Sequence, residues 1–178
     1  MKSNIVLIGF MGTGKTTVGR LLAKKLGRKF IETDSVIERL AGKSIPQIFQ
    51  SDGEIAFREL EIEAIKETAR SKYAVIAGGG GIVLNKINID RLKENGKIVY
   101  LTATPREIIK RVAAGAGQRP LLEAGNPALA VRDLLRFRKP FYERAADITI
   151  NTANPDIEAI AGQIIDRLKE DESFDFSK

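Results

Sequence analysis

The sequence predicts an α/β fold in which a parallel sheet lies between two layers of helices. Short apolar runs that suit buried strands alternate along the chain with longer segments whose apolar residues repeat at helical spacing. Glycines or acidic residues directly follow several of these runs, at the strand ends where open α/β sheets bind ligands. Strands that alternate with helices form parallel sheets through right-handed crossovers. We therefore expect five parallel strands in one domain, residues 1–178, with helices on both faces.

The first expected strand, residues 4–8, leads into a glycine-rich segment at residues 9–17 and a helix at about 14–26. The segment fits the Walker A pattern, which is Gly, any four residues, Gly, Lys and then Ser or Thr. Its glycines let consecutive backbone N–H groups point inward, and the following helix adds the partial positive charge of its N-terminus. The segment predicts a site for the phosphates of ATP or GTP. The alternative is a turn that binds nothing, and the strand and helix on either side argue against it.

Individual residues of this segment have distinct expected roles. Lys15 reaches the outer phosphates and is a candidate catalytic residue, and the Thr16 hydroxyl is placed to bind Mg²⁺. The residues expected to contact the nucleotide are Gly12, Thr13, Gly14, Lys15, Thr16 and Thr17.

The composition limits the chemistry that the chain can perform. Of 178 residues, 43% are hydrophobic and 29% are charged, which is typical of a globular domain. The chain has no cysteine and no histidine, so it has no disulfide, no zinc site of those residues and no histidine base. Acid–base catalysis must therefore come from carboxylates, lysine or tyrosine.

The charge distribution favours a local site for anions. The net charge is +6 and the pI is about 9.6, which alone is compatible with nucleic-acid binding. However, aromatic residues make up only 6% of the chain, there is no nucleic-acid motif, and arginines gather between Arg106 and Arg144. The apolar run at the N-terminus is too short for a signal peptide or a membrane span. We expect a cytoplasmic protein that binds neither nucleic acid nor membrane.

The second expected strand, residues 29–31, ends at Glu32-Thr33-Asp34. These carboxylates lie where the phosphates and an acceptor would bind, and no other acidic pair follows a strand. Asp34 also suits the N-cap of a helix over residues 35–41, so spacing alone leaves the two roles equal.

Two helices are expected next, a short one that begins near Pro46 and a longer one from about residue 54 to 71. On the longer helix, Glu54, Phe57, Arg58 and Glu61 share one face. The simplest interpretation is a solvated ion-pair face, although Phe57 does not suit it.

The third expected strand, residues 73–77, runs into four consecutive glycines at residues 78–81. Such a run allows a ligand to approach the backbone closely, whereas a flexible loop is the alternative. Asn85-Lys86 resembles the start of the guanine-reading motif Asn-Lys-x-Asp, but Asn88 replaces its acid, so we do not assign that role.

The remaining pattern completes the sheet and adds a candidate lid. Glycines and small residues surround Arg119 in the segment 113–127, which is typical of a mobile lid, although a surface loop has the same composition. We expect the last residues, 170–178, to be frayed. The other expected elements are a strand at 98–101, helices at 105–112 and 128–144, a strand at 148–150 and a helix ending at about 169.

Taken together, in this order and spacing, these segments resemble the shikimate kinase family over nearly the whole chain. The matching segments are the Walker segment, Thr33-Asp34 with Ile37-Glu38, Gly42-x-Ser44-Ile45 with Ile48-Phe49, Gly53-Glu54-x-x-Phe57-Arg58-x-x-Glu61, Gly79-Gly80-Gly81, Arg119-Pro120-Leu121-Leu122, and Arg138 before Pro140-x-Tyr142.

The resemblance implies a nucleoside-monophosphate-kinase type of fold with strand order 2-3-1-4-5. It implies transfer of the ATP γ-phosphoryl group to the 3-hydroxyl of shikimate, with Mg²⁺, on the path to chorismate and the aromatic amino acids. The products are shikimate 3-phosphate and ADP. It also implies an acceptor-binding region at about 34–61, a lid at about 113–127 and a monomeric enzyme.

The resemblance also implies roles for particular residues. Asp34 holds shikimate hydroxyls and is the candidate base, while Arg58 and Arg138 bind the shikimate carboxylate. The other implied contacts are Gly79, Gly80 and Gly81 along the acceptor and γ-phosphate, Arg119 closing over the phosphates as a catalytic residue, and Arg111 and Pro155 beside the adenine.

One position departs from the family pattern, which has Asp-x-Asp after the second strand where this chain has Glu32-Thr33-Asp34. The first acid of that pattern reaches Mg²⁺ through water. Because Glu32 is one methylene longer, it either keeps that role or binds the metal directly.

Two other functions fit parts of the sequence. A kinase for a different hydroxy acid, such as gluconate, would share the scaffold but does not explain Asp34, Arg58 and Arg138 together. A nucleotide-dependent switch protein would need only the Walker segment, and it leaves the second arginine site and the lid without a role.

Overall fold

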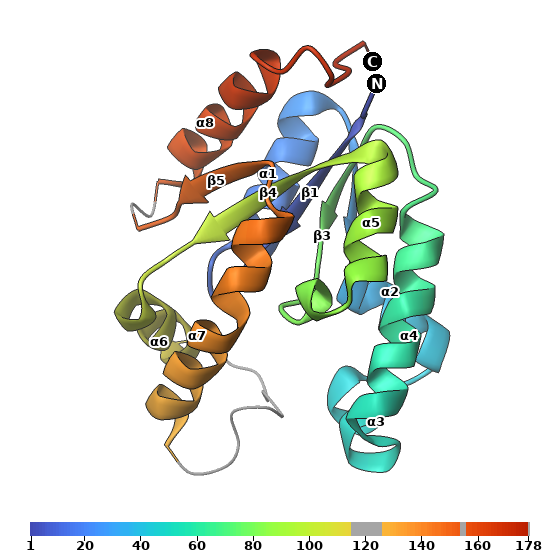
Figure 1. Ribbon diagram of the computed structural model, residues 1–178, viewed down its shortest axis with the longest axis vertical. Coiled ribbons are helices and arrows are strands. Elements are labelled where there is room, and N and C mark those ends of the chain that lie inside the picture. Colours follow the sequence, from blue (N-terminus) through green and yellow to red (C-terminus); the bar gives the residue numbers. More distant parts are fainter. Residues whose placement is uncertain (115–125, 154–155, 178) are drawn as a thin grey trace.

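The computed structural model describes residues 1–114, 126–153 and 156–177, and it contains a five-stranded parallel sheet. The strand order is β2-β3-β1-β4-β5, which confirms the expected fold class (Figure 1). The first strand is therefore central, between β3 and β4. The strands are β1 (Asn4–Ile8), β2 (Lys29–Glu32), β3 (Ala74–Ala77), β4 (Gly96–Thr102) and β5 (Ile148–Asn151).

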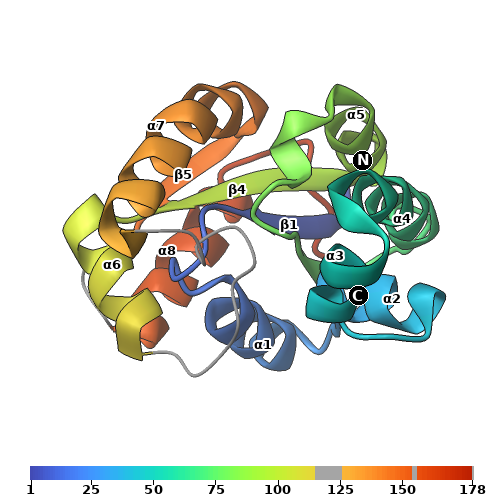
Figure 2. The same cartoon turned by 90° about the horizontal axis from the view of Figure 1, so that it is seen from below.

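Helices cover both faces of the sheet, which makes three layers (Figure 2). In the central strand, Ile5 and Leu7 pack toward α1 and α8, whereas Val6 and Ile8 pack toward α5 and α7, as the period of two in a strand requires. The helices are α1 (Lys15–Leu26), α2 (Thr33–Ala41), α3 (Ile45–Ser51), α4 (Gly53–Thr68), α5 (Lys86–Asn95), α6 (Pro105–Ala114), α7 (Pro127–Ala145) and α8 (Ile157–Lys169), with a short 3₁₀ turn, η1 (Ile82–Leu84).

A third and smaller core holds α2, α3 and α4 together beside the sheet. Ile37, Ile48, Phe57 and Ala64 form its buried centre. Ser44 begins α3 with a capping box in which its hydroxyl accepts from Gln47 N–H and the Gln47 side chain accepts from Ser44 N–H. This small core positions the helices that carry Asp34 and Arg58.

Two expectations about local structure are wrong, and one helix was not predicted. Asp34 does not cap its helix: α2 begins at Thr33, and Asp34 lies within its first turn. The helix α5 was not expected, because residues 86–95 are mostly polar and only Asn88, Ile89 and Leu92 are buried. Asn85 caps this helix by accepting a hydrogen bond from Ile87 N–H at 3.0 Å, which accounts for its presence before Lys86.

The other wrong expectation concerns the C-terminal segment. Residues 171–177 pack against the start of the chain, where Lys2 forms a parallel bridge with Phe174. The buried Arg28 guanidinium lies 5.8 Å, 5.2 Å and 5.7 Å from the ring centroids of Tyr73, Phe174 and Phe176, and it donates to the Asp175 carbonyl at 2.9 Å. These contacts fix the described part of this segment, and both ends lie at one end of the molecule (Figure 1). Within the described ranges, no helix combines the length and the apolar composition that a membrane span requires.

Candidate active site

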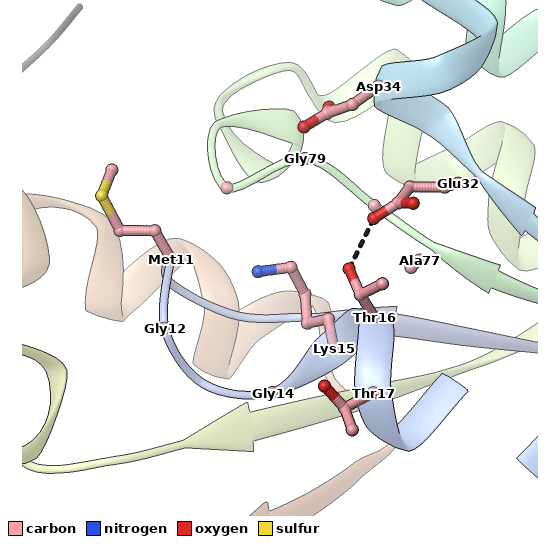
Figure 3. A pocket seen from close by; sticks show the side chains of 12 residues that line it. Met11, Gly12, Gly14, Lys15, Thr16, Thr17, Glu32, Asp34, Ala77 and Gly79 are labelled. Atoms are coloured by element: carbon pink, nitrogen blue, oxygen red, sulfur yellow. Dashed lines mark hydrogen bonds between the residues drawn. The ribbon is translucent and has the colours of Figure 1, made fainter. Parts of the chain in front are cut away.

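A cavity of about 350 Å³ lies at the carboxyl ends of β1, β2 and β3 (Figure 3). Three segments form its walls: the Walker loop, the turn from β2 into α2, and the glycine turn after β3. Because neighbouring parallel strands end at the same edge of a sheet, segments far apart in sequence meet here. The lining residues are Met11, Gly12, Gly14, Lys15, Thr16, Thr17, Glu32, Asp34, Ala77, Gly78, Gly79 and Gly80.

The Walker loop has the backbone shape that its glycines predict. Gly9, Gly12 and Gly14 have φ values of +150°, +76° and +90°, which other residues rarely adopt. A Cβ on Gly9 would lie 2.5 Å from the Leu101 carbonyl oxygen, so this position has no room for a side chain. The Lys15 ammonium donates to the carbonyls of Gly9 and Phe10 at 2.8 Å and 2.9 Å. The loop therefore encloses the lysine, and Figure 3 shows its side chain directed into the cavity.

Thr16 and Glu32 meet on one wall of the cavity. The Thr16 hydroxyl donates to a Glu32 carboxylate oxygen at 2.5 Å, and the other oxygen lies 3.9 Å from the Arg20 guanidinium. A hydroxyl and a carboxylate are hard oxygen donors, and Mg²⁺ is typically bound by one or two carboxylates together with substrate phosphates and water. The described residues contain no group of three or more acidic, histidine or cysteine side chains suited to a metal. The pair therefore suits a Mg²⁺ ion that shares its ligands with a nucleotide.

The glycine turn at residues 79–81 is where three charged side chains converge. A Cβ on Gly79 would lie 2.8 Å from an Asp34 carboxylate oxygen, and one on Gly80 would lie 3.5 Å from Arg138 Nη1. A Cβ on Gly81 would lie 2.4 Å from Arg58 Nη1. Each glycine thus leaves room for one charged group, from α2, α7 and α4 respectively.

Hydrogen bonds hold this glycine turn in place. Gly78 N–H donates to the Leu7 carbonyl and Gly79 N–H donates to the Thr33 hydroxyl, both at 3.0 Å. The Tyr142 hydroxyl donates to the Gly80 carbonyl. Burial raises the pKa of Tyr142 well above its ordinary value, so this hydroxyl keeps its proton. The bonds favour a fixed binding turn over the flexible-loop alternative.

The charged face of α4 is buried in part, so its interpretation as a solvated ion-pair face is wrong. The Glu61 side chain is 2% exposed, and both of its oxygens accept hydrogen bonds from Arg58 Nη1 at 3.1 Å. Burial raises the Glu61 pKa, although the Arg58 guanidinium opposes that rise. Glu61 was not among the expected site residues, and its signal was its place beside the buried Phe57 on the same helical face.

Arg138 approaches the same place from α7. It is 3% exposed, and its guanidinium lies 5.8 Å from the centroid of the Phe10 ring. Its Nε–H is buried and has no hydrogen-bond partner within the described ranges. A buried guanidinium with an unpaired donor favours an anionic ligand. Tyr142, one turn further along α7, was also missed, because its partner Gly80 is 62 residues away.

A second, smaller cavity of about 200 Å³ lies on the other side of the Walker loop, beside Arg111. Arg111 donates to the carbonyls of Gly12 and Thr152 at 3.2 Å and 2.7 Å, and it lines the cavity with Thr17 and Ile157. This place suits the nucleoside end of a nucleotide whose phosphates lie on the loop. Pro155 and Arg119 fall outside the described residues, as does most of the expected lid.

The fold and the site together define a P-loop kinase that acts on a small molecule. A Walker loop after the central strand provides the phosphate site. Asp34, Gly79 and Gly80 line the same cavity, and the guanidinium groups of Arg58 and Arg138 adjoin it at residues 80 and 81, which provides an acceptor site.

Comparison with known proteins gives the family. The family model described as "Shikimate kinase" matches residues 11–169. The shikimate kinases of Caldanaerobacter subterraneus subsp. tengcongensis and Moorella thermoacetica are 48% and 46% identical to this chain, over 91% and 95% of it and over 94% and 96% of their own lengths. The solved shikimate kinase of Acinetobacter baumannii in complex with shikimate has a TM-score of 0.91 and 39% identity, covering 97% of this chain and 96% of that one. The chain belongs to the shikimate kinase family, the ATP:shikimate 3-phosphotransferases of aromatic amino acid biosynthesis.

Proposed function

We propose that this chain performs the shikimate kinase reaction in the 350 Å³ cavity, with ATP phosphates on the Walker loop and shikimate against residues 79–81. The observation that carries this assignment is the convergence of Asp34, Arg138 and Arg58 on three successive glycines. Shikimate has one carboxylate and three hydroxyls, so it needs cationic and carboxylate groups together. The complex of the Acinetobacter baumannii relative with shikimate supports the same acceptor.

Arg58 and Arg138 bind the shikimate carboxylate in this proposal. A guanidinium presents N–H donors in a planar fork that matches the two carboxylate oxygens. Arg138 has a buried Nε–H without a partner in the described ranges, and Glu61 holds Arg58 in position. Glu54 accepts from the other terminal nitrogen of Arg58 at 3.2 Å, so two carboxylates orient this fork before the substrate arrives.

Asp34 orients the 3-hydroxyl of shikimate and accepts its proton as the hydroxyl oxygen attacks the γ-phosphorus. The bond between that phosphorus and the oxygen bridging to the β-phosphate breaks, and ADP leaves. Lys15 and the backbone N–H groups of the Walker loop offset the charge on the phosphates. In the same proposal Arg119 closes over the phosphates from the lid, while Arg111 and Pro155 flank the adenine.

Thr16 and Glu32 would hold Mg²⁺. The metal ion, when bound, neutralises charge on the β- and γ-phosphates. The direct hydrogen bond between the two side chains supports a shared ligand role, with Glu32 either in contact with the ion or reaching it through water. Without a metal, Glu32 anchors the Thr16 hydroxyl at the start of α1.

The broader organisation is part of the proposal. One sheet supports the whole described chain, which favours a single kinase domain over residues 1–178. Within it, the acceptor-binding region spans about 34–61 and the lid about 113–127. We propose that the enzyme is a cytoplasmic monomer.

A coupled assay of ADP release tests these assignments directly. With ATP and Mg²⁺, we expect a high rate when shikimate is added and little ADP release when it is omitted or replaced by gluconate. Arg58→Ala should raise the shikimate KM at least about tenfold, because the carboxylate loses a charged fork. The matched control is Arg70→Ala, an exposed arginine just beyond α4, which should leave the KM unchanged.

Because Arg58→Ala leaves Glu61 buried without its partner, ADP affinity serves as the check on folding. An Arg58→Ala variant that binds ADP normally and keeps the wild-type shikimate KM would overturn the assignment of Arg58.

A further inference from the structure

A separate hollow of about 300 Å³ lies behind the glycine turn, between η1, α5 and α7. Both views place the segment after residue 81 between these two helices (Figures 1 and 2). The hollow shares no lining residue with the catalytic cavity or with the cavity beside Arg111. The two cavities assigned to the kinase substrates therefore do not extend into it.

The floor of this hollow is apolar and comes from three elements. Val83 of η1, Ile89 of α5 and Ala145 of α7 are buried, with 4%, 7% and 5% of their surfaces exposed. Leu84 and the half-buried ring of Phe141 complete it. Such a floor suits a hydrocarbon body, and it offers no donors for the many hydroxyls of a sugar or a sugar-like acid.

The rim carries an excess of positive charge. It has three cations, Lys86, Lys93 and Arg144, and one acid, Asp90. Lys86 pairs with Asp90 at 2.5 Å, whereas Lys93 and Arg144 have no ion pair within residues 1–114, 126–153 and 156–177. The Arg144 guanidinium lies 5.3 Å from the centroid of the Phe141 ring, which keeps a positive charge against the apolar wall. Two positive charges at the rim are thus left for a ligand.

From the apolar floor and this unpaired charge, we infer that the hollow is a binding site for a small amphipathic carboxylate. The ligand class is an aromatic or branched hydrocarbon body with one carboxylate group. Its body packs on Val83, Ile89 and Phe141, and its carboxylate faces Lys93 and Arg144. The volume of about 300 Å³ limits the ligand to a small molecule, since it is at the lower end of ligand pockets.

The site adjoins the acceptor side of the enzyme through two short connections. Val83 lies two residues after Gly81, which borders Arg58. Tyr142 lies between the lining residues Phe141 and Arg144, and its hydroxyl bonds to the Gly80 carbonyl. A bound carboxylate therefore contacts η1, which directly follows the glycine turn, and α7, whose Tyr142 holds the turn.

The fluorescent probe 8-anilinonaphthalene-1-sulfonate tests the site, because it combines an aromatic body with one negative charge and the chain contains no tryptophan to interfere. The titration is done with saturating ADP and shikimate, so that both substrate positions are filled. We expect one probe molecule per chain. 3-Phenylpropionate should displace it at concentrations at which the uncharged 3-phenylpropan-1-ol does not.

Charge substitutions on the rim provide the matched comparison. The double variant Lys93→Glu with Arg144→Glu should bind the probe at least tenfold more weakly, and the neutral double variant Lys93→Gln with Arg144→Gln should show a smaller loss. The control double variant is Lys24→Glu with Lys72→Glu, two exposed lysines outside the hollow, which should bind within twofold of wild type.

Three results would each overturn the inference. They are absence of probe binding while ADP and shikimate are saturating, equal loss of affinity in the rim and control variants, and equal displacement by the acid and the alcohol. Because the probe binds without turnover, a failure here is separate from any failure of the kinase assay.

Discussion

The two ends of the catalytic site use different chemical groups. At the phosphate end, the Walker loop relies on backbone groups and on glycines with positive φ, and it is continuous with the central strand of the sheet. At the acceptor end, the groups are charged side chains from α2, α4 and α7, brought together at residues 79–81. The phosphate end is thus part of the main core, whereas two of the three acceptor helices pack on a small core of their own.

This difference predicts how each end responds to substitution. A change in backbone at the phosphate end must disturb the sheet, because Gly9 touches the Leu101 carbonyl of β4. A substitution at the acceptor end first displaces the flexible ends of charged side chains and leaves the backbone in place. Substitutions at the phosphate end should therefore change the free energy of unfolding and nucleotide affinity together. Substitutions at the acceptor end should change shikimate binding without changing the free energy of unfolding.

The largest effect is expected for Lys15→Ala at the phosphate end. Removal of the ammonium should lower kcat by about 10²–10³-fold, because charge developing on the phosphates loses a fixed cation. The control is Lys24→Ala, on the exposed side of the same helix, and its kcat should equal that of the wild type in steady-state kinetics. A kcat for Lys15→Ala within threefold of wild type would contradict the assigned role.

Gly9→Ala should come next and should act on the fold. Its φ of +150° and the 2.5 Å approach to the Leu101 carbonyl lead us to expect a loss of about 3 kcal/mol in the free energy of unfolding. Urea denaturation measures this loss, and ADP affinity should fall with it. The control is Gly162→Ala in α8, where an added Cβ meets nothing within 4 Å, and stability should stay level or rise. Equal free energies of unfolding for Gly9→Ala and Gly162→Ala would contradict the prediction that the backbone at the phosphate end cannot accept a side chain.

Gly81→Ala tests the same contrast at the acceptor end. Here the added Cβ meets the guanidinium of Arg58 at 2.4 Å, and the φ of −96° suits any residue. Arg58 should move and the backbone should not, so the shikimate KM should rise about tenfold while the free energy of unfolding changes by less than about 1 kcal/mol. A loss of stability like that of Gly9→Ala would show that both ends are equally rigid.

The smallest expected effect is a pH dependence that arises at the acceptor end alone. Burial raises the Glu61 pKa above its ordinary value of 4.5, so Glu61 takes up a proton at a higher pH than an exposed carboxylate does. As the pH falls through this raised pKa, Arg58 loses the negative charge of its buried partner, Glu61, and is held only by the exposed Glu54, so the shikimate KM should rise severalfold. The Glu61→Gln variant has no titrating group at this position. Its shikimate KM should therefore rise only at the pH at which the shikimate carboxylate itself is protonated. The KM for ATP should stay level in both proteins, and identical shikimate profiles would refute the role of Glu61.

Much of the fold and of the phosphate site followed from local patterns. The apolar run before Gly9 and the helical spacing after Lys15 suffice to place β1, the Walker loop and α1. A site formed by backbone groups can be predicted from local sequence because adjacent residues form it. Residues 86–95 were missed as a helix because their few buried side chains give a weak pattern, and tertiary packing stabilises α5.

The acceptor end was harder to predict because its contacts join distant parts of the chain. The spacing on α4 indicated a shared face for Arg58 and Glu61 but not that Glu61 is buried. The hydrogen bond from Tyr142 to Gly80 joins residues that are 62 positions apart, and the bond from Arg28 to Asp175 joins residues that are 147 positions apart. No local sequence pattern indicates such contacts. The resemblance to a family supplied Arg138 and Asp34, where spacing alone left several roles open.

The central position of β1 has a consequence for synthesis on the ribosome. The strand that leads into the Walker loop is made first, yet its partners are residues 75–77 of β3 and 96–100 of β4. β3 emerges before half of the 178 residues have been released, whereas β4 and the Leu101 carbonyl against which Gly9 packs emerge only after the midpoint. A nascent chain thus carries the phosphate-binding residues without the sheet that shapes them. The ability to hold a nucleotide should appear late and abruptly, when β4 joins the sheet.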